Sequence, residues 1–278
     1  MSSYAISFTV FLAACFGAQT LALRQSGGKT VKSESNYFSS VARIQTETRG
    51  EPRVMLLGSS MTGRLSDRGA VLRGVANLGC DGGSAVVTLR AMDKGLLPAA
   101  PVLVIEANTL SYALENRGRE IAAAIGSDWF KLGTRLPNVS ATARPTAFAY
   151  SWLMARKESS APASGELSVS TKPVRLSAGE APALDPAASA LVDELAGILG
   201  RLEAKGSRVI LVMLPPGVKA GCVQADLPRA LACKTGLPWW DLNDGIAPGS
   251  VGFTDGLHLD APSASKVLAA IIRAVESR

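Results

Sequence analysis

Hydrophobic and polar positions along the chain alternate between short apolar runs and amphipathic segments. Five runs of five to eight mostly apolar residues are bounded by turn residues: Arg53–Leu57, Val71–Leu78, Pro101–Ile105, Arg208–Leu214 and Leu237–Leu242. Short continuous runs of this kind are typical of strands that are buried on both faces of a sheet. We therefore expect five strands.

Helical spacing appears in the segments between and after these runs. Between Asp185 and Gly206 the apolar residues recur every three or four positions, with Asp185-Pro186 as the predicted start and Gly206 as the end. A second helix should begin after Asp260 and continue to the C-terminus. Strands that alternate with such helices predict an α/β fold: a three-layer α/β/α domain over residues 51–278, with a parallel five-stranded sheet.

The N-terminus carries twenty consecutive residues without a charge, Tyr4–Leu23. A helix of this length is long enough to span the hydrocarbon core of a bilayer. We predict that residues 1–24 form a signal anchor or a cleaved signal peptide, with lipidation at Cys15 as an alternative. A buried core helix fits less well because the segment has no polar stripe. The polar residues 25–50 are interpreted as a linker.

Two further segments bear on organisation and compartment. Cys222 and Cys233 lie in a stretch that resembles a loop, and a disulfide between them is expected; two unpaired thiols are the alternative. Disulfides persist in oxidising compartments, so this pair would favour export to the cell envelope or secretion.

Residues 126–183 interrupt the alternation of strands and helices and are interpreted as an insertion, either a lid over a site or a surface loop.

Composition narrows the possible chemistry. The net charge is +6 and no block of five basic residues occurs, so charge does not indicate nucleic-acid binding. The chain contains a single histidine, His258, which excludes a zinc site with two histidine ligands from one chain. Any mechanism that needs an imidazole must use His258.

Candidate catalytic residues cluster at the predicted carboxyl ends of strands, where open parallel sheets bind ligands. Gly58-Ser59-Ser60 follows the first strand, and a serine hydroxyl needs a base such as His258 to become a nucleophile. Asp255 could orient the imidazole. The N–H groups of Ser60 and Gly82 and the side chain of Asn108 could stabilise an oxyanion.

Each of these residues also has a structural interpretation. Ser60 could cap a helix, with Ser59 as the alternative nucleophile, and His258 could be an exposed loop residue. Asn108 could cap a turn, and Gly82 or Gly79 could be plain turn glycines.

These residues resemble the blocks of the SGNH hydrolase superfamily, the GDSL-like lipases and esterases. The first block appears as Gly58-Ser59-Ser60-Met61, the second as Asn77 to Gly83, the third as Glu106-Ala107-Asn108-Thr109 and the last as Asp255 to His258. The resemblance implies a flavodoxin-like sheet and a catalytic Ser60, Asp255 and His258, with an oxyanion hole of Ser60, Gly82 and Asn108. It covers roughly residues 53–110 and 205–277.

The blocks also depart from the family pattern. Ser59 replaces the aspartate of the first block, and the third block keeps only its asparagine; the Gly-Ser-Ser version resembles distant, envelope-anchored members. Three functions follow as expectations. The preferred one is serine esterase or acyl hydrolase, with a carboxylic ester as substrate, such as an O-acyl group on an envelope glycan, and with no metal or cofactor required. The alternatives are an O-acyltransferase that uses the same triad on a polysaccharide, and a non-catalytic scaffold with the same fold.

Overall fold

The computed structural model describes residues 3–25, 33–65, 74–157, 172–247 and 249–276. A six-stranded sheet has the strand order β2-β1-β3-β5-β6-β4. The strands are β1 (Val54–Gly58), β2 (Val75–Gly79), β3 (Val102–Glu106), β4 (Val174–Arg175), β5 (Arg208–Met213) and β6 (Pro238–Asp241). All neighbours pair in parallel except β4, which pairs antiparallel with β6. The predicted α/β class is confirmed, but the sheet has six strands rather than five, because β4 from the insertion adds a short edge strand.

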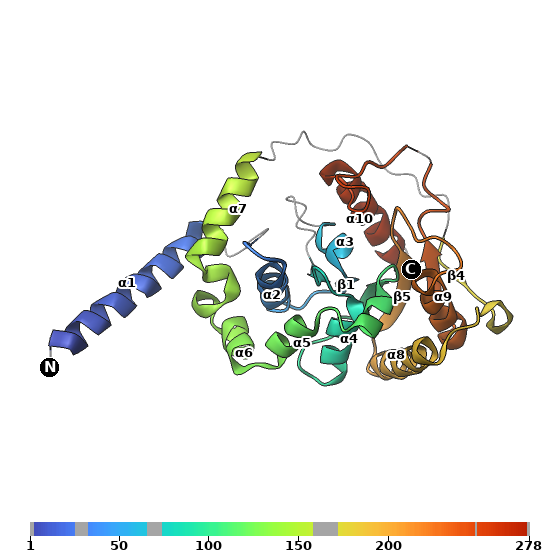
Figure 1. The fold of residues 1–278 in the computed structure, drawn as a ribbon, viewed down its shortest axis with the longest axis horizontal. Helices are drawn as coiled ribbons and strands as arrows, with labels where there is room; N and C mark the ends of the chain where they lie inside the picture. The colour runs from blue at the N-terminus through green and yellow to red at the C-terminus, as the bar shows by residue number, and fades with distance from the viewer. Residues whose placement is uncertain (1–2, 26–32, 66–73, 158–171, 248, 277–278) are drawn as a thin grey trace.

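Helices cover both faces of the sheet (Figure 1). Alternate residues of β1 point to opposite faces, so Met55 and Leu57 join one apolar core while Val54 and Leu56 join the other. The first core lies under α2 (Asn36–Glu47), α4 (Ala85–Asp93), α8 (Pro186–Ala204) and α9 (Val223–Thr235). The second core lies under α10 (Ala261–Glu276). Burial on both faces explains why the strands appear in the sequence as continuous apolar runs.

The two helices predicted from spacing begin and end close to the expected residues. Asp185 caps α8 by accepting a hydrogen bond from the Ala188 N–H at 2.8 Å, and Gly206 follows its end with a φ of +97°. Asp260 caps α10 through the Ser263 N–H at 2.9 Å. The remaining helical elements are α3 (Ser60–Gly63), α5 (Arg119–Gly126), α6 (Asp128–Arg135), α7 (Pro145–Lys157) and the 3-10 turns η1 (Leu110–Glu115), η2 (Pro137–Val139), η3 (Ala141–Ala143) and η4 (Ala178–Glu180).

The interpretation of residues 25–50 as a linker is wrong over its second half, and the folded domain begins before residue 51. Residues 36–47 form α2, in which Val41 and Ile44 are fully buried in the first core. Gln45, also fully buried, donates from Nε2 to the Phe130 carbonyl at 3.0 Å and accepts from the Ala141 N–H at 2.9 Å. The helix looks polar in sequence because several of its buried side chains are polar and have specific partners. Residues 26–32 lie outside the described residues.

The predicted insertion, residues 126–183, is helical over its first half. Helices α6 and α7 with turns η2 and η3 pack beside α2, and the later part supplies β4 and η4. Residues 158–171, the Ser/Ala/Pro/Gly-rich part, lie outside the described residues.

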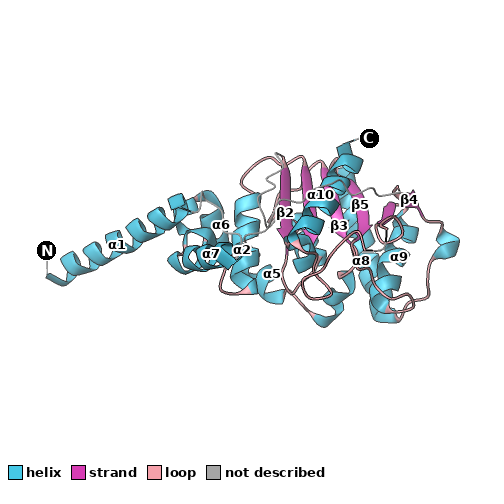
Figure 2. Ribbon diagram, turned by 90° about the horizontal axis from the view of Figure 1, so that it is seen from above, coloured by secondary structure: helices cyan, strands magenta, loops and turns pink. Residues whose placement is uncertain are grey.

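Helix α1 (Ser3–Gln25) is the predicted N-terminal apolar helix and projects from the rest of the chain (Figures 1 and 2). It is long and apolar enough to cross a membrane, and a signal sequence has the same properties. Only its last part packs on the domain, where the Asn138 side chain donates to Thr20 Oγ1 at 3.1 Å. The helix is consistent with export or membrane association.

The predicted disulfide between Cys222 and Cys233 is wrong, because the segment between them is helical. Cys222 caps the start of α9 and Cys233 lies near its end, and both thiols are free. Eleven residues of α-helix rise about 16 Å, whereas the Cα atoms of a disulfide lie at most about 7 Å apart. The pair therefore does not support an oxidising compartment, and α1 alone carries the prediction of export.

Candidate active site

The predicted site residues emerge at one edge of the sheet. Gly58 at the end of β1 is in register with Gly79 at the end of β2, and β3 ends beside them at Glu106. The carboxyl ends of parallel strands form the edge where ligands bind in open α/β sheets. The residues that follow these strands, among them Ser60 and Gly82, therefore share one edge.

Three side chains from distant parts of the sequence form a connected row. Ser60 Oγ lies 2.8 Å from His258 Nε2, although the two residues are 198 positions apart. On the other side of the ring, His258 Nδ1 lies 2.7 Å from Asp255 Oδ2. Because an ionised carboxylate only accepts hydrogen bonds, the proton belongs on Nδ1, and Nε2 is left to accept the Ser60 hydroxyl proton.

The loop that carries His258 fixes its own geometry. Asp255 Oδ1 accepts hydrogen bonds from the backbone N–H groups of His258, at 2.8 Å, and Leu257, at 3.2 Å. Gly256, between Asp255 and Leu257, has a φ of +77°, a conformation that suits glycine. The His258 N–H above all, with the imidazole and the Leu257 N–H, holds the pKa of Asp255 well below its usual range. The carboxylate that orients the ring therefore stays charged near neutral pH.

The turn that carries Ser60 is anchored by a buried glutamate. Ser60 is the first residue of α3, and Ser59 is the cap. Glu106, 2% exposed, accepts hydrogen bonds from the N–H groups of Ser59 and Thr62 and from the hydroxyls of Ser59, Thr62 and Thr109, at 2.7–3.1 Å. A single carboxylate thus fixes both sides of the residue that presents the hydroxyl. The sequence showed Glu106 only as a departure from the third family block.

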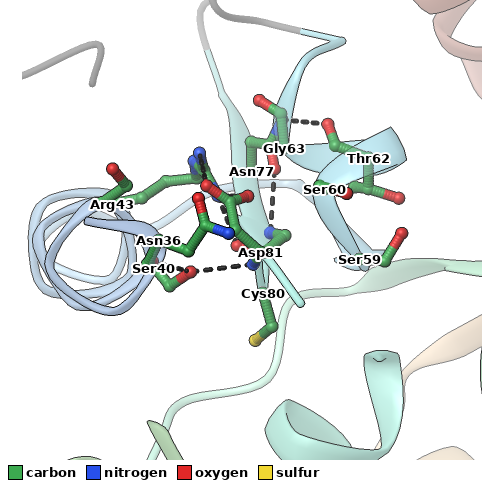
Figure 3. A network of polar contacts seen from close by, with 12 residues as sticks. Asn36, Ser40, Arg43, Ser59, Ser60, Thr62, Gly63, Asn77, Cys80 and Asp81 are labelled. Carbon is green, nitrogen blue, oxygen red and sulfur yellow. Dashed lines mark hydrogen bonds and ion pairs between the residues drawn. The ribbon is translucent and has the colours of Figure 1, made fainter. Parts of the chain in front are cut away.

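A second buried side chain holds the other end of this turn. Asn77 donates to the Thr62 carbonyl at 2.7 Å and accepts from the Gly79 N–H at 2.9 Å (Figure 3). The turn lies so close to β2 that a Cβ on Gly79 would be 2.3 Å from the Gly63 nitrogen. The β2 strand is therefore packed directly against α3, and a side chain at position 79 would force them apart.

The three predicted oxyanion donors differ in their surroundings. Within the part of the chain that the structure describes, neither the Ser60 N–H nor the Gly82 N–H has a protein acceptor. The Asn108 side chain is bound at both ends to Leu214, whose carbonyl accepts its amide at 2.9 Å and whose N–H donates to its oxygen at 2.8 Å. These bonds fix the Asn108 amide and use one of its two N–H groups, and the second has no protein acceptor among the described residues.

Helix α2 contributes a buried ion pair to the same edge. Arg43, 8% exposed, contacts Asp81 at 3.1 Å and donates to the Gly79 carbonyl, while the Asp81 N–H donates to Ser40 Oγ at 2.8 Å (Figure 3). The loop after β2, which carries Gly82, is thus tied to α2. Sequence reasoning missed this contribution because it treated residues 25–50 as a linker; the signal it passed over was an arginine in a segment with apolar residues at helical spacing.

Ser59 and Cys80 could also act as nucleophiles at this edge, but both are poorly placed for that role. Ser59, 3% exposed, donates its hydroxyl to Glu106 rather than to the imidazole. Burial raises the pKa of the Cys80 thiol to about 12, so its reactive thiolate does not form near neutral pH. Of these side chains, only Ser60 meets His258.

Arg64 lies beside Asp255, with its Nη1 atom 3.6 Å from Asp255 Oδ2.

Among the described residues, no three His, Cys, Asp or Glu side chains gather in a group that could hold a metal ion. Comparison with protein families finds no matching family model, and neither a curated protein nor a solved structure matches the chain.

Proposed function

We propose that the chain is a serine hydrolase that cleaves carboxylic esters through an acyl-enzyme on Ser60. The observation that carries this proposal is the row Ser60–His258–Asp255, with contacts of 2.8 and 2.7 Å. Ion pairs and hydrogen bonds that only stabilise a fold do not require the single histidine to meet a serine hydroxyl at the ligand-binding edge of the sheet. A nucleophile, a base and a group that orients the base are the parts of the Ser-His-Asp arrangement, which catalyses acyl transfer on several unrelated folds.

The geometry supports the following steps. Ser60 Oγ attacks the ester carbonyl carbon while its proton passes to His258 Nε2, and the carbonyl oxygen becomes an oxyanion. The N–H groups of Ser60 and Gly82, with the free N–H of Asn108, are the donors available to stabilise it. The C–O bond to the alcohol then breaks, and the alcohol leaves with the proton from the imidazolium. Water attacks the acyl group in the same way, gives a proton to His258 and releases the acid, and Ser60 regains its hydrogen.

The resemblance to SGNH hydrolases also supports this proposal. In the order β2-β1-β3-β5-β6, the parallel strands have the flavodoxin-like order expected for that fold. Two of the departures from the family blocks, those at positions 59 and 106, meet at one place, because Glu106 binds Ser59. A carboxyl group is missing at position 59 and present at position 106, so the turn keeps a carboxylate anchor that comes from the neighbouring strand. We infer that the carboxylate that anchors the turn has moved from position 59 to position 106, and that the turn can still present Ser60 for catalysis.

Helix α1 bears on where this reaction takes place. A membrane-anchored or exported enzyme would meet ester groups of the cell envelope, and O-acyl groups on envelope glycans are the substrates we propose. The protein would then contact the membrane through α1 and need no nucleic acid.

The proposal is tested with the purified protein, 4-nitrophenyl acetate and a fluorophosphonate probe, which forms an Oγ–P bond with an activated serine and releases fluoride. We expect ester hydrolysis and one probe adduct per chain, located on Ser60 by peptide mass spectrometry. Ser60→Ala should abolish both, whereas Ser189→Ala, which removes an exposed hydroxyl on α8, should change neither. An adduct on another serine, or hydrolysis that survives Ser60→Ala, would refute the assignment.

A further inference from the structure

A pocket of about 410 Å³ opens beside Gly82. Its walls come from three elements that are distant in sequence. Asn36 and Tyr37 at the start of α2 form one side, Asp81 and Gly82 after β2 form the second, and residues 116–121, which lead into α5, form the third. This volume lies within the range of small-molecule sites, about 300–1,000 Å³.

The pocket adjoins the turn that carries the proposed nucleophile. Asp81 is part of its wall, and a Cβ on Gly63 in α3 would lie 2.8 Å from Asp81 Oδ1. Gly82, which the proposed function makes an oxyanion donor, is also part of the wall. A molecule with its ester group at Ser60 could therefore place the remainder of its structure in this pocket.

The chemistry of the walls favours a polar ligand without net charge. Asn36 and Asn116 contribute amides, and Tyr37 contributes a phenol with its ring. Arg119 and Glu120 stand side by side in the wall with opposite charges. Asp81 is already paired with Arg43, so it adds little net charge.

Among the lining residues, Ile121 is the one aliphatic side chain beyond the Tyr37 ring, and the remaining apolar surface of the pocket comes from carbon atoms of polar residues and glycines. Hydrocarbon sites are lined mostly by apolar and aromatic groups. A long acyl chain would here cover polar groups without satisfying their hydrogen bonds. A ring with several hydroxyls, by contrast, can exchange hydrogen bonds with amides, a phenol and charges of both signs, and can pack its C–H face on the tyrosine ring.

We propose that this pocket binds the alcohol part of the ester, and that this part is a neutral polyhydroxylated ring, a sugar residue. The inference rests on the proposed function, because it assigns the pocket to the group that leaves when Ser60 is acylated.

Two variants and a control test the pocket in the full chain. Asn116 is exposed and has a φ of +54°, so Asn116→Gly removes the amide and keeps a residue that tolerates this conformation. Glu120→Ala removes an exposed carboxylate from the wall. Glu51→Ala removes an equally exposed carboxylate just before β1, at the opposite end of the strands. The substrates are 4-nitrophenyl acetate, whose alcohol is not a sugar, and 6-O-acetylglucose, whose ring keeps its other hydroxyls.

The expected result is a split between the two substrates. Each pocket variant should raise KM for 6-O-acetylglucose by roughly three- to tenfold more than KM for 4-nitrophenyl acetate, because only the sugar loses about one hydrogen bond. Glu51→Ala should change neither. Equal effects on both substrates, or no effect on the sugar ester, would overturn the pocket assignment while the hydrolase proposal stands. If the unmodified protein hydrolyses neither ester, both the proposed function and the pocket assignment are overturned.

Discussion

The turn that carries Ser60 and the loop that carries His258 are held in place in different ways. Glu106 and Asn77, each 2% exposed, fix the turn from β3 and β2 by hydrogen bonds to its backbone and hydroxyls. The loop is mostly exposed over residues 254–257 and is held largely by its own bonds, from Asp255 to two N–H groups and between Thr254 and His258. The proposed nucleophile is thus held by buried groups of the fold, whereas the proposed base lies on a loop at the surface.

This difference predicts how substitutions should behave. A change at the turn leaves buried polar groups without partners and should lower stability and activity together. A change in the exposed loop should lower activity with little effect on folding.

The largest loss of activity is expected for His258→Ala. Without its base, Ser60 has no acceptor for its proton, and the rate of ester hydrolysis should fall by roughly 10³–10⁴-fold. The free energy of unfolding, measured in urea, should change by less than about 1 kcal/mol. Unfolding of the variant at much lower urea would show that the loop is a structural element, against the contrast drawn here.

Asp255→Asn should have the next largest effect, a loss of rate approaching that of His258→Ala, because the amide no longer orients the ring or stabilises the imidazolium. The lowered pKa of Asp255 means that its contribution to folding is complete above the ordinary carboxyl pKa and is lost as pH falls below that value. The Asp255 carboxylate therefore stays charged across the pH range of the assay. A loss of less than about tenfold in Asp255→Asn would argue against the pairing.

At the turn, Glu106→Gln should lower kcat by roughly 10–100-fold, because a displacement of the nucleophile of a fraction of an ångström disturbs attack. The Gln amide also faces the N–H groups and hydroxyls that the carboxylate accepted, so the free energy of unfolding should fall by about 1–3 kcal/mol. Glu203→Gln, an exposed substitution on α8, is the matched control.

A positioning role for Glu106 makes a second demand. The double substitution Ser59→Asp, Glu106→Gly moves the carboxyl group back to the strand where the family carries it, and should recover part of the lost kcat. A variant that recovers stability without kcat would reduce Glu106 to a structural residue.

The smallest effect is expected for the cysteines, which lie outside both regions. Because α9 separates Cys222 from Cys233, alkylation without prior reduction should modify both thiols once the chain is unfolded. Reducing agent should leave the melting temperature unchanged. Detection of a Cys222–Cys233 disulfide would contradict the helix between them.

The sequence predicted the five parallel strands and the contact of Ser60, His258 and Asp255 because both depend on local signals. A buried strand is a continuous apolar run, and with a single histidine in the chain the base had one candidate. The pairing of Ser60 with His258 required in addition that both lie at the same edge, which the alternation of strands and helices implies.

The parts that the sequence did not predict depend on partners elsewhere in the chain. Helix α2 buries Arg43 and Gln45, and these are tolerated only because Asp81, Phe130 and Ala141 meet them. At position 106 the sequence showed only that the glycine of the third family block is missing. Most hydrogen-bond donors to the Glu106 carboxylate come from the turn after β1, which is distant in sequence. The cysteine segment carries Pro228, which suggested a loop but lies inside α9. In each case a local pattern was overridden by tertiary contacts.

The central claim is that His258 accepts the Ser60 proton through Nε2 while Asp255 holds Nδ1. Since the chain has one histidine, ¹⁵N NMR of the imidazole gives signals from a single ring. At a pH where the ring is neutral, the account predicts a proton on Nδ1 and none on Nε2, with the Nε2 signal shifted in Ser60→Ala and the Nδ1 signal shifted in Asp255→Asn. A proton on Nε2, or an Nε2 signal that does not respond to Ser60→Ala, would contradict it.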